Sequence, residues 1–172
     1  MKRTILLMAA AVGAALVTAA CGGTGSYGSY GTSNSSGSTP AAAGTATISV
    51  ANSSRGQILV DASGRTLYLF EADKPASSSC YGACIGVWPA VITTGQPAAG
   101  PGVKASLLGT TKRTDGTLEV VYNGHPLYYF SGDKAAGDVT GQGLSSFGAP
   151  WYVVSPGGMK IDTDSVPSVG GY

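Results

Sequence analysis

A stretch of eight residues that occurs twice constrains this chain more than any other feature. The sequence LYLFEADK at residues 67–74 returns as LYYFSGDK at residues 127–134, sixty positions later. Extended without a gap, residues 58–74 align with residues 118–134, and seven of the 17 pairs are identical. Unrelated segments of this length would share roughly one residue. The chain therefore contains an internal duplication.

Each copy has the pattern of a β-hairpin followed by a long loop. In the second copy, Asn123-Gly124 separates two apolar runs, and Asn-Gly is the strongest short-range hairpin signal because a type I′ turn needs positive φ at both central residues. Tyr68 and Phe70 should share one strand face, with leucines on the other. No segment beyond the leader has a helical period. We expect an all-β fold in which two pseudo-symmetric hairpin repeats form a small antiparallel sandwich or partly closed barrel.

The N-terminus has the features of an export signal. Lys2-Arg3 precedes an apolar run over residues 5–17, and small residues then lead to Cys21. This stretch resembles a bacterial lipoprotein signal peptide, which implies cleavage after residue 20 and a lipid on Cys21. An ordinary secretory signal and an uncleaved anchor are the alternatives. We expect a chain that is exported and lipid-anchored to the outer face of the cell membrane.

Composition separates the remaining chain into parts. Residues 21–44 are rich in Gly, Ser and Thr, which predicts a flexible tether after the lipidated cysteine. Residues 45–162 should form the duplicated β-domain, and residues 163–172 a disordered tail. The ten basic residues include two in the leader, so eight face nine acidic residues in the mature chain. No Lys/Arg cluster is longer than two residues, which excludes a nucleic-acid footprint.

Two cysteines remain once Cys21 is assigned to the lipid. Export places Cys80 and Cys84 in an oxidising space, where a disulfide is the leading interpretation. Gly82 between them favours an irregular turn, because a regular helix would hold the Cβ atoms too far apart. A Cu(I) site with His125, the only histidine, and a redox-active pair are the alternatives.

The two motif aspartates also allow two interpretations. Asp73 and Asp133 could bracket a ligand or take part in acid–base chemistry. Alternatively, an Asp just beyond a strand accepts backbone N–H bonds and stabilises the loop that follows. The structural interpretation explains why both copies keep the residue beside aromatic core positions.

Taken together, the motifs resemble those of the bacterial secreted-repeat lipoproteins, a family with the pattern Tyr-x-aromatic-x-x-Asp. Residues 80–89 also resemble the family's Cys-x-Gly-Ala-Cys…Trp-Pro pattern, and the resemblance covers about residues 47–156. The family is largely without an assigned activity, so the resemblance implies a location more than a task. The residues that carry the motif are Tyr68, Phe70, Asp73, Tyr128, Phe130 and Asp133.

We therefore expect a non-catalytic binding or structural module of the cell envelope, without a cofactor. Its partners would be the membrane, through the lipid anchor, and cell-envelope polymers or proteins, but not nucleic acid. One alternative is a Cu(I)-binding or redox protein that uses Cys80, Cys84 and His125. Another is an enzyme that acts on envelope polymers through the paired aspartates.

Overall fold

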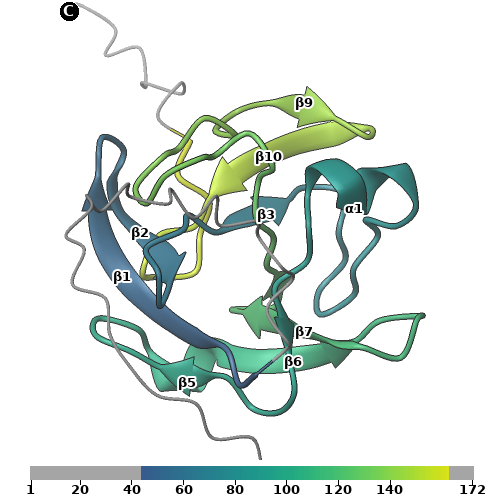
Figure 1. Ribbon diagram of the computed structural model, residues 1–172, viewed down its shortest axis with the longest axis horizontal. Helices are drawn as coiled ribbons and strands as arrows, with labels where there is room; N and C mark the ends of the chain where they lie inside the picture. Colours follow the sequence, from purple (N-terminus) through teal and green to yellow (C-terminus); the bar gives the residue numbers. More distant parts are fainter. Residues whose placement is uncertain (1–43, 163–172) are drawn as a thin grey trace, which may run out of the picture. The chain divides into compact units, whose positions relative to one another are not determined.

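The computed structural model describes residues 44–162, which form an almost entirely β structure (Figure 1). The expected signal peptide, Cys21, all but the last residue of the tether, and the expected tail lie outside the described residues. The strands are β1 (Thr47–Ser53), β2 (Gly56–Asp61), β3 (Tyr68–Phe70), β4 (Ile92–Thr93), β5 (Ala98–Ala99), β6 (Leu108–Lys112), β7 (Leu118–Tyr122), β8 (His125–Pro126), β9 (Ser145–Ser146) and β10 (Ala149–Val153).

These strands form three small sheets. β1 lies between β2 and β5, β10 lies between β3 and β9, and β7 lies between β4 and β6 and also pairs with β8. Every pairing is antiparallel except the two-residue contact of β1 with β5, and the sheets do not close on one another. The predicted all-β fold built from two repeats is confirmed.

The duplicated unit is longer than the motif. The hairpin β1–β2 of the first repeat corresponds to the hairpin β6–β7 of the second, so each repeat begins with a strand that precedes the aligned residues. The turn after β1 holds two residues, because Ser53 pairs with Gly56. The turn after β6 holds three, because the Arg113 N–H donates to the Thr117 carbonyl. β2 and β7 are therefore related by an offset one residue larger than sixty.

The turn that follows β2 and β7 restores the offset of sixty residues between the two repeats. Leu67 N–H donates to the Leu59 carbonyl, and the matching Leu127 N–H donates to the Val120 carbonyl. Leu59 and Val120 are thus equivalent, and the ungapped pairing of Val60 with Val120 was wrong. The other six identities are unaffected, because Gly64 and Gly124 each end this turn and the five identities of the motif follow it.

The two motif strands meet at the centre of the fold. Tyr68 N–H donates to the Tyr128 carbonyl at 2.8 Å, and Tyr128 N–H donates to the Tyr68 carbonyl at 3.0 Å. β3 then pairs with β10 of the second repeat, whereas Tyr128 bridges Ala90 of the first. Each motif strand therefore pairs with a segment of the other repeat.

Side chains on the two faces of these strands fill two cores. Tyr68 and Phe70 pack in one cluster with both tryptophans, and Leu67 and Leu69 pack in the other. This is the alternation that the sequence predicted. The strands are apolar on both faces because both faces are buried.

Short helical turns were not expected. α1 (Ala83–Val87) follows Gly82, whose positive φ of 58° turns the backbone between the two cysteines. The 3₁₀ helix η1 covers Ala105–Leu107. The Trp88 N–H donates to the Cys84 carbonyl and ends α1, and the next strand is β4. Within residues 44–162, no helix is long and apolar enough to cross a membrane.

Candidate functional site

Each motif tyrosine donates its hydroxyl to the motif aspartate of the other repeat. The Tyr68 hydroxyl lies 2.7 Å from Asp133 Oδ2, and the Tyr128 hydroxyl lies 2.7 Å from Asp73 Oδ2. We call these two bonds the reciprocal brace. Because the tyrosines also share a backbone bridge, the brace fastens the two repeats to each other where they cross.

The second oxygen of each carboxylate orders the loop that follows it. Asp73 Oδ1 accepts the N–H and the hydroxyl of Ser79, at 2.7 and 2.6 Å. Asp133 Oδ1 accepts the N–H and the hydroxyl of Thr140, at 2.9 and 2.6 Å. Each aspartate thus accepts three hydrogen bonds within the fold. These contacts match the structural interpretation of the motif, in which the aspartate stabilises the loop that follows it.

Burial keeps the donors of the brace protonated. It raises the pKa of the Tyr68 and Tyr128 hydroxyls well above their usual value. Burial also raises the pKa of Asp73, against the opposing effect of its bonds from Ser79 and Tyr128. Phenols that stay protonated in this way act as hydrogen-bond donors and not as bases.

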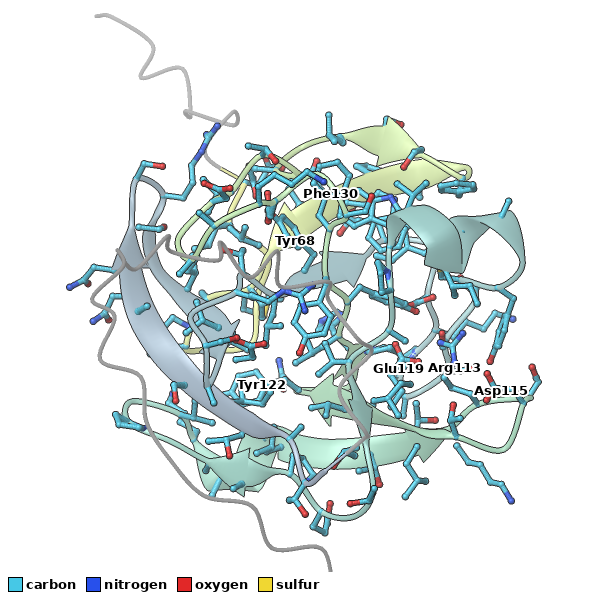
Figure 2. The ribbon with its side chains drawn as sticks, viewed as in Figure 1. Tyr68, Arg113, Asp115, Glu119, Tyr122 and Phe130 are labelled. Carbon is cyan, nitrogen blue, oxygen red and sulfur yellow. A yellow bond between two sulfur atoms is a disulfide. The ribbon has the colours of Figure 1, made fainter. Side chains whose placement is uncertain are left out.

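The motif aromatics pack against the two tryptophans. Trp88 and Trp151 stack with ring centres 4.0 Å apart and planes 3° apart. Phe70 stacks on Trp151 at 4.0 Å, and Phe130 leans on Trp88 at 4.5 Å, so each phenylalanine also contacts the other repeat. Figure 2 shows Tyr68 and Phe130 within this cluster. A side chain at Gly141 would bring its Cβ within 2.9 Å of Trp88.

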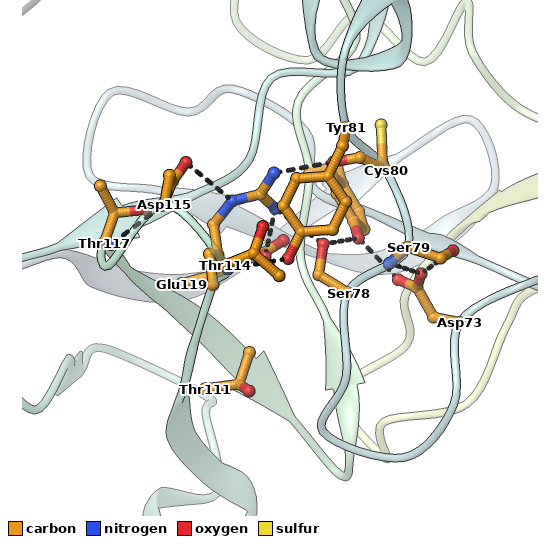
Figure 3. Close-up of polar contacts among 12 residues, drawn as sticks. Asp73, Ser78, Ser79, Cys80, Tyr81, Thr111, Thr114, Asp115, Thr117 and Glu119 are labelled. Carbon is orange, nitrogen blue, oxygen red and sulfur yellow. Dashed lines mark hydrogen bonds and ion pairs between the residues drawn. The ribbon is translucent and has the colours of Figure 1, made fainter.

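The structure reveals a buried ion pair that sequence reasoning missed. Arg113 Nη1 donates to Glu119 Oε2 at 2.6 Å, and the two side chains are 1% and 0% exposed. Arg113 also donates to Ser78 Oγ and to the Cys80 carbonyl, both at 2.7 Å, and lies over the Tyr81 ring (Figure 3). The guanidinium thereby holds the cysteine loop against β6 and β7.

This ion pair is connected to the reciprocal brace. Ser78 Oγ lies 2.7 Å from the Tyr128 hydroxyl. Because that hydroxyl donates to Asp73, Ser78 is the donor of this bond and accepts from Arg113 in turn. A directed chain of hydrogen bonds therefore runs from the guanidinium to a motif carboxylate.

Glu119 is the residue of this network whose hydrogen-bonding groups are least satisfied. Its Oε1 is the one buried side-chain oxygen or nitrogen without a hydrogen-bond partner among the described residues. Burial raises the pKa of Glu119 to about 7, although the bond from Arg113 opposes the rise. The equivalent position of the first repeat is Ile58, so a charged residue where the other repeat has an apolar core residue was the available signal.

A small pocket opens beside the ion pair. It has a volume of about 240 Å³ and is lined by Ile85, Pro89, Ala90, Ile92, Arg113, Asp115 and Thr117. Asp115 accepts the N–H and hydroxyl of Thr117, which lower its pKa. The polar atoms of Arg113 that face this region are already bonded to the protein.

Cys80 and Cys84 form the predicted disulfide, with Cα atoms 5.3 Å apart. The Cu(I) alternative would need both sulfurs as thiolates. Among residues 44–162, no three His, Cys, Asp or Glu side chains are placed to share a metal ion. His125 lies in β8, opposite Tyr122, and belongs to the hairpin and not to the cysteine loop.

Comparison with known proteins identifies the family. The sequence profile of a family described as a secreted repeat of unknown function matches residues 49–92 and 109–155, together more than half of the chain. The two matched segments are the two repeats of the fold. No curated protein and no solved structure matches the chain significantly. The chain belongs to this family of secreted repeats, whose proteins are exported from the cytoplasm.

Proposed function

We propose that this protein is a non-catalytic module of the cell envelope, held at the outer face of the membrane by a lipid on Cys21. One observation carries the proposal. The polar groups of the Tyr-x-aromatic-x-x-Asp motif, the tyrosine hydroxyls and aspartate carboxylates, bond to each other in the reciprocal brace and to the loops that follow. The motif therefore has a structural task that accounts for its duplication.

The brace suits a protein that works outside the cytoplasm. Two interlocked repeats, a disulfide and a buried ion pair hold long loops in place without a large helical scaffold. A bond from a neutral phenol to a half-buried carboxylate is among the stronger hydrogen bonds, because one partner is charged. The binding role lies with surfaces outside the motif.

Turnover is the test of the non-catalytic assignment. Purified exported protein is incubated with envelope polymers, and Asp73→Ala and Asp133→Ala are compared with the parent. We expect no product from any of them. A measured turnover that either substitution abolishes, in a variant that still unfolds cooperatively, would refute the proposal.

Membrane attachment has a separate test. Replacing Cys21 by Ala should move the protein from the membrane fraction into the medium, and labelling with a fatty-acid analogue should disappear. Retention of the Cys21→Ala chain in the membrane fraction would remove the lipid anchor. A mass spectrum of the exported protein checks the copper alternative, which gains support only if copper binds to the reduced pair Cys80 and Cys84.

A further inference from the structure

The turn between β9 and β10 holds an exposed aromatic side chain in a backbone conformation that bulky residues rarely adopt. Phe147 has a φ of 56° and is 47% exposed, and Gly148 follows with a φ of 98°. Two positive φ values suit a type I′ turn, for which Asn-Gly is the favoured sequence. The β7–β8 hairpin of this chain uses Asn123-Gly124 there, with φ of 49° and 83°. Phenylalanine destabilises this turn and still leaves about half of its side chain exposed, which points to a task at the surface.

A second exposed apolar side chain lies a similar number of residues before the tryptophan of the other repeat. Ile85 in α1 is 40% exposed and lies three residues before Trp88, and Phe147 lies four residues before Trp151. The two tryptophans stack, and Trp88 Nε1 donates to Ser146 Oγ in β9. α1 and the β9–β10 hairpin therefore lie together (Figure 1).

Leu144, 42% exposed, precedes β9 on the same hairpin, and its carbonyl accepts the Trp151 N–H. We call Ile85, Leu144 and Phe147 the apolar tip. Its members project from segments that the tryptophan pair holds in place.

The segments that carry the apolar tip have no charges. Residues 75–103 and 139–159 contain no Asp, Glu, Lys, Arg or His. The pocket that Ile85 lines includes two charged side chains from outside these segments, Arg113 and Asp115. Charged polymers would find no ionic partner on these segments, whereas hydrocarbon requires none. The surface chemistry favours an apolar, non-directional partner.

The size of the apolar tip argues against a second copy as the partner. Three side chains that are each less than half exposed present about 250 Å² of surface in total. A stable protein interface buries about 800 Å² on each partner. Contact with hydrocarbon has no such minimum, because binding to a lipid surface scales with the apolar area inserted.

We propose that the apolar tip inserts into the boundary between lipid headgroups and acyl chains. This inference rests on the proposed lipid anchor, because the tether of residues 21–44 would then keep the domain close to a membrane. A coil of this length has a mean span of about 25 Å. Linkage of this kind gives an effective concentration in the millimolar range, at which a weak contact is populated. The domain then lies against the membrane with the hairpin and α1 facing the lipid.

The test supplies the anchor chemically. The chain from Cys21 onward has one thiol outside the disulfide, because the chain holds three cysteines. This thiol is coupled to a maleimide lipid in phosphatidylcholine vesicles. Phe147→Trp serves as the reporter, since Trp88 and Trp151 are both 0% exposed and should not respond to lipid. We expect a blue-shifted emission that acyl-chain bromolipids quench, and unquenched emission would overturn the proposal.

A second measurement separates docking from folding. The Cys21→Ala chain is partitioned between vesicles and buffer without coupling, with and without Phe147→Asn. This substitution installs the chain's own Asn-Gly turn, so the unfolding midpoint should rise by a few degrees. The partition coefficient should fall about tenfold, because a large apolar group is removed.

The control is Met159→Asn, at a 61% exposed apolar position that contacts the side chain of Asn123 in the β7–β8 turn. Partition that survives Phe147→Asn, that falls equally in Met159→Asn, or that requires anionic lipid would overturn the proposal. The vesicle experiment supplies the lipid chemically, so it does not depend on lipidation in cells. A failure of the proposed lipid anchor would therefore appear only in the fractionation of the Cys21→Ala chain.

Discussion

The reciprocal brace makes a prediction about which tyrosine is coupled to which aspartate. Tyr68 and Asp73 belong to the same motif, but the structure joins Tyr68 to Asp133 and Tyr128 to Asp73. A double-mutant cycle of Tyr68→Phe with Asp133→Ala should show a coupling energy. The matched cycle of Tyr68→Phe with Asp73→Ala pairs residues that no side-chain hydrogen bond joins, and it should show a smaller one.

The size of the effect follows from the geometry of the bond. A hydrogen bond to a charged group contributes about 1.5–3 kcal/mol. The 2.7 Å bond of Tyr68 is buried on the tyrosine side, so Tyr68→Phe should lower the free energy of unfolding by about 2 kcal/mol. The bonds that Thr140 donates to Asp133 are lost in both Asp133→Ala variants and cancel in the cycle. The coupling should therefore be about 1–2 kcal/mol across the repeats.

Urea unfolding followed by tryptophan fluorescence is the assay, with the disulfide intact in every variant. Trp88 and Trp151 lie against the two tyrosines, so the signal reports on the crossing of the repeats. A larger coupling for Tyr68 with Asp73 than with Asp133 would refute the brace. Equal stability of Tyr68→Phe and the parent would refute it as well.

Three further predictions concern the buried charge, the turns and the aromatic core. The pKa of Glu119 is about 7 in the fold against 4.5 unfolded, so its stabilising effect is full below about pH 4.5 and is lost as the pH rises through 7. The loss in the free energy of unfolding approaches about 3 kcal/mol. Urea titrations between about pH 5 and 8 should show that the stability of Glu119→Gln depends less on pH than that of the parent. Asn123→Phe should destabilise the β7–β8 turn by about 1–2 kcal/mol, because it places a bulky residue at positive φ and removes the bond that Asn123 donates to the Gly158 carbonyl, and an unchanged unfolding midpoint would contradict the turn argument. Gly141→Ala should cost about 1–3 kcal/mol by crowding Trp88, visible as a weakened near-ultraviolet circular dichroism signal, and an unchanged spectrum would count against it.

Local signals predicted much of the fold. Asn123 and Gly124 have the positive φ values that a type I′ turn requires, because this preference resides in the two residues themselves. The alternation of side chains along residues 67–70 predicted two buried faces, because it too depends only on adjacent residues. The disulfide between Cys80 and Cys84 followed from spacing and export. Each of these depends on neighbours within a few positions.

The register of the first hairpin could not be predicted in the same way. The ungapped alignment relates Val60 to Val120, but turns of different length shift β7 by one residue and then shift the chain back. Two compensating changes leave the total spacing at sixty, so the sequence offers no sign of them. The hydrogen bonds between strands reveal both changes, because these bonds depend on the partner strand.

The sequence by itself determined that two copies of one hairpin exist and that their aromatic residues are buried. Only the tertiary structure decided that the copies interlock, with Tyr68 bonded to Asp133 and Phe70 stacked on Trp151. Only the structure placed Glu119 in the core opposite Arg113. The physical reason is that a periodic pattern specifies the face on which a side chain lies. The hydrogen-bond partner of Tyr68 is 65 positions away in the sequence and comes close only when the chain folds.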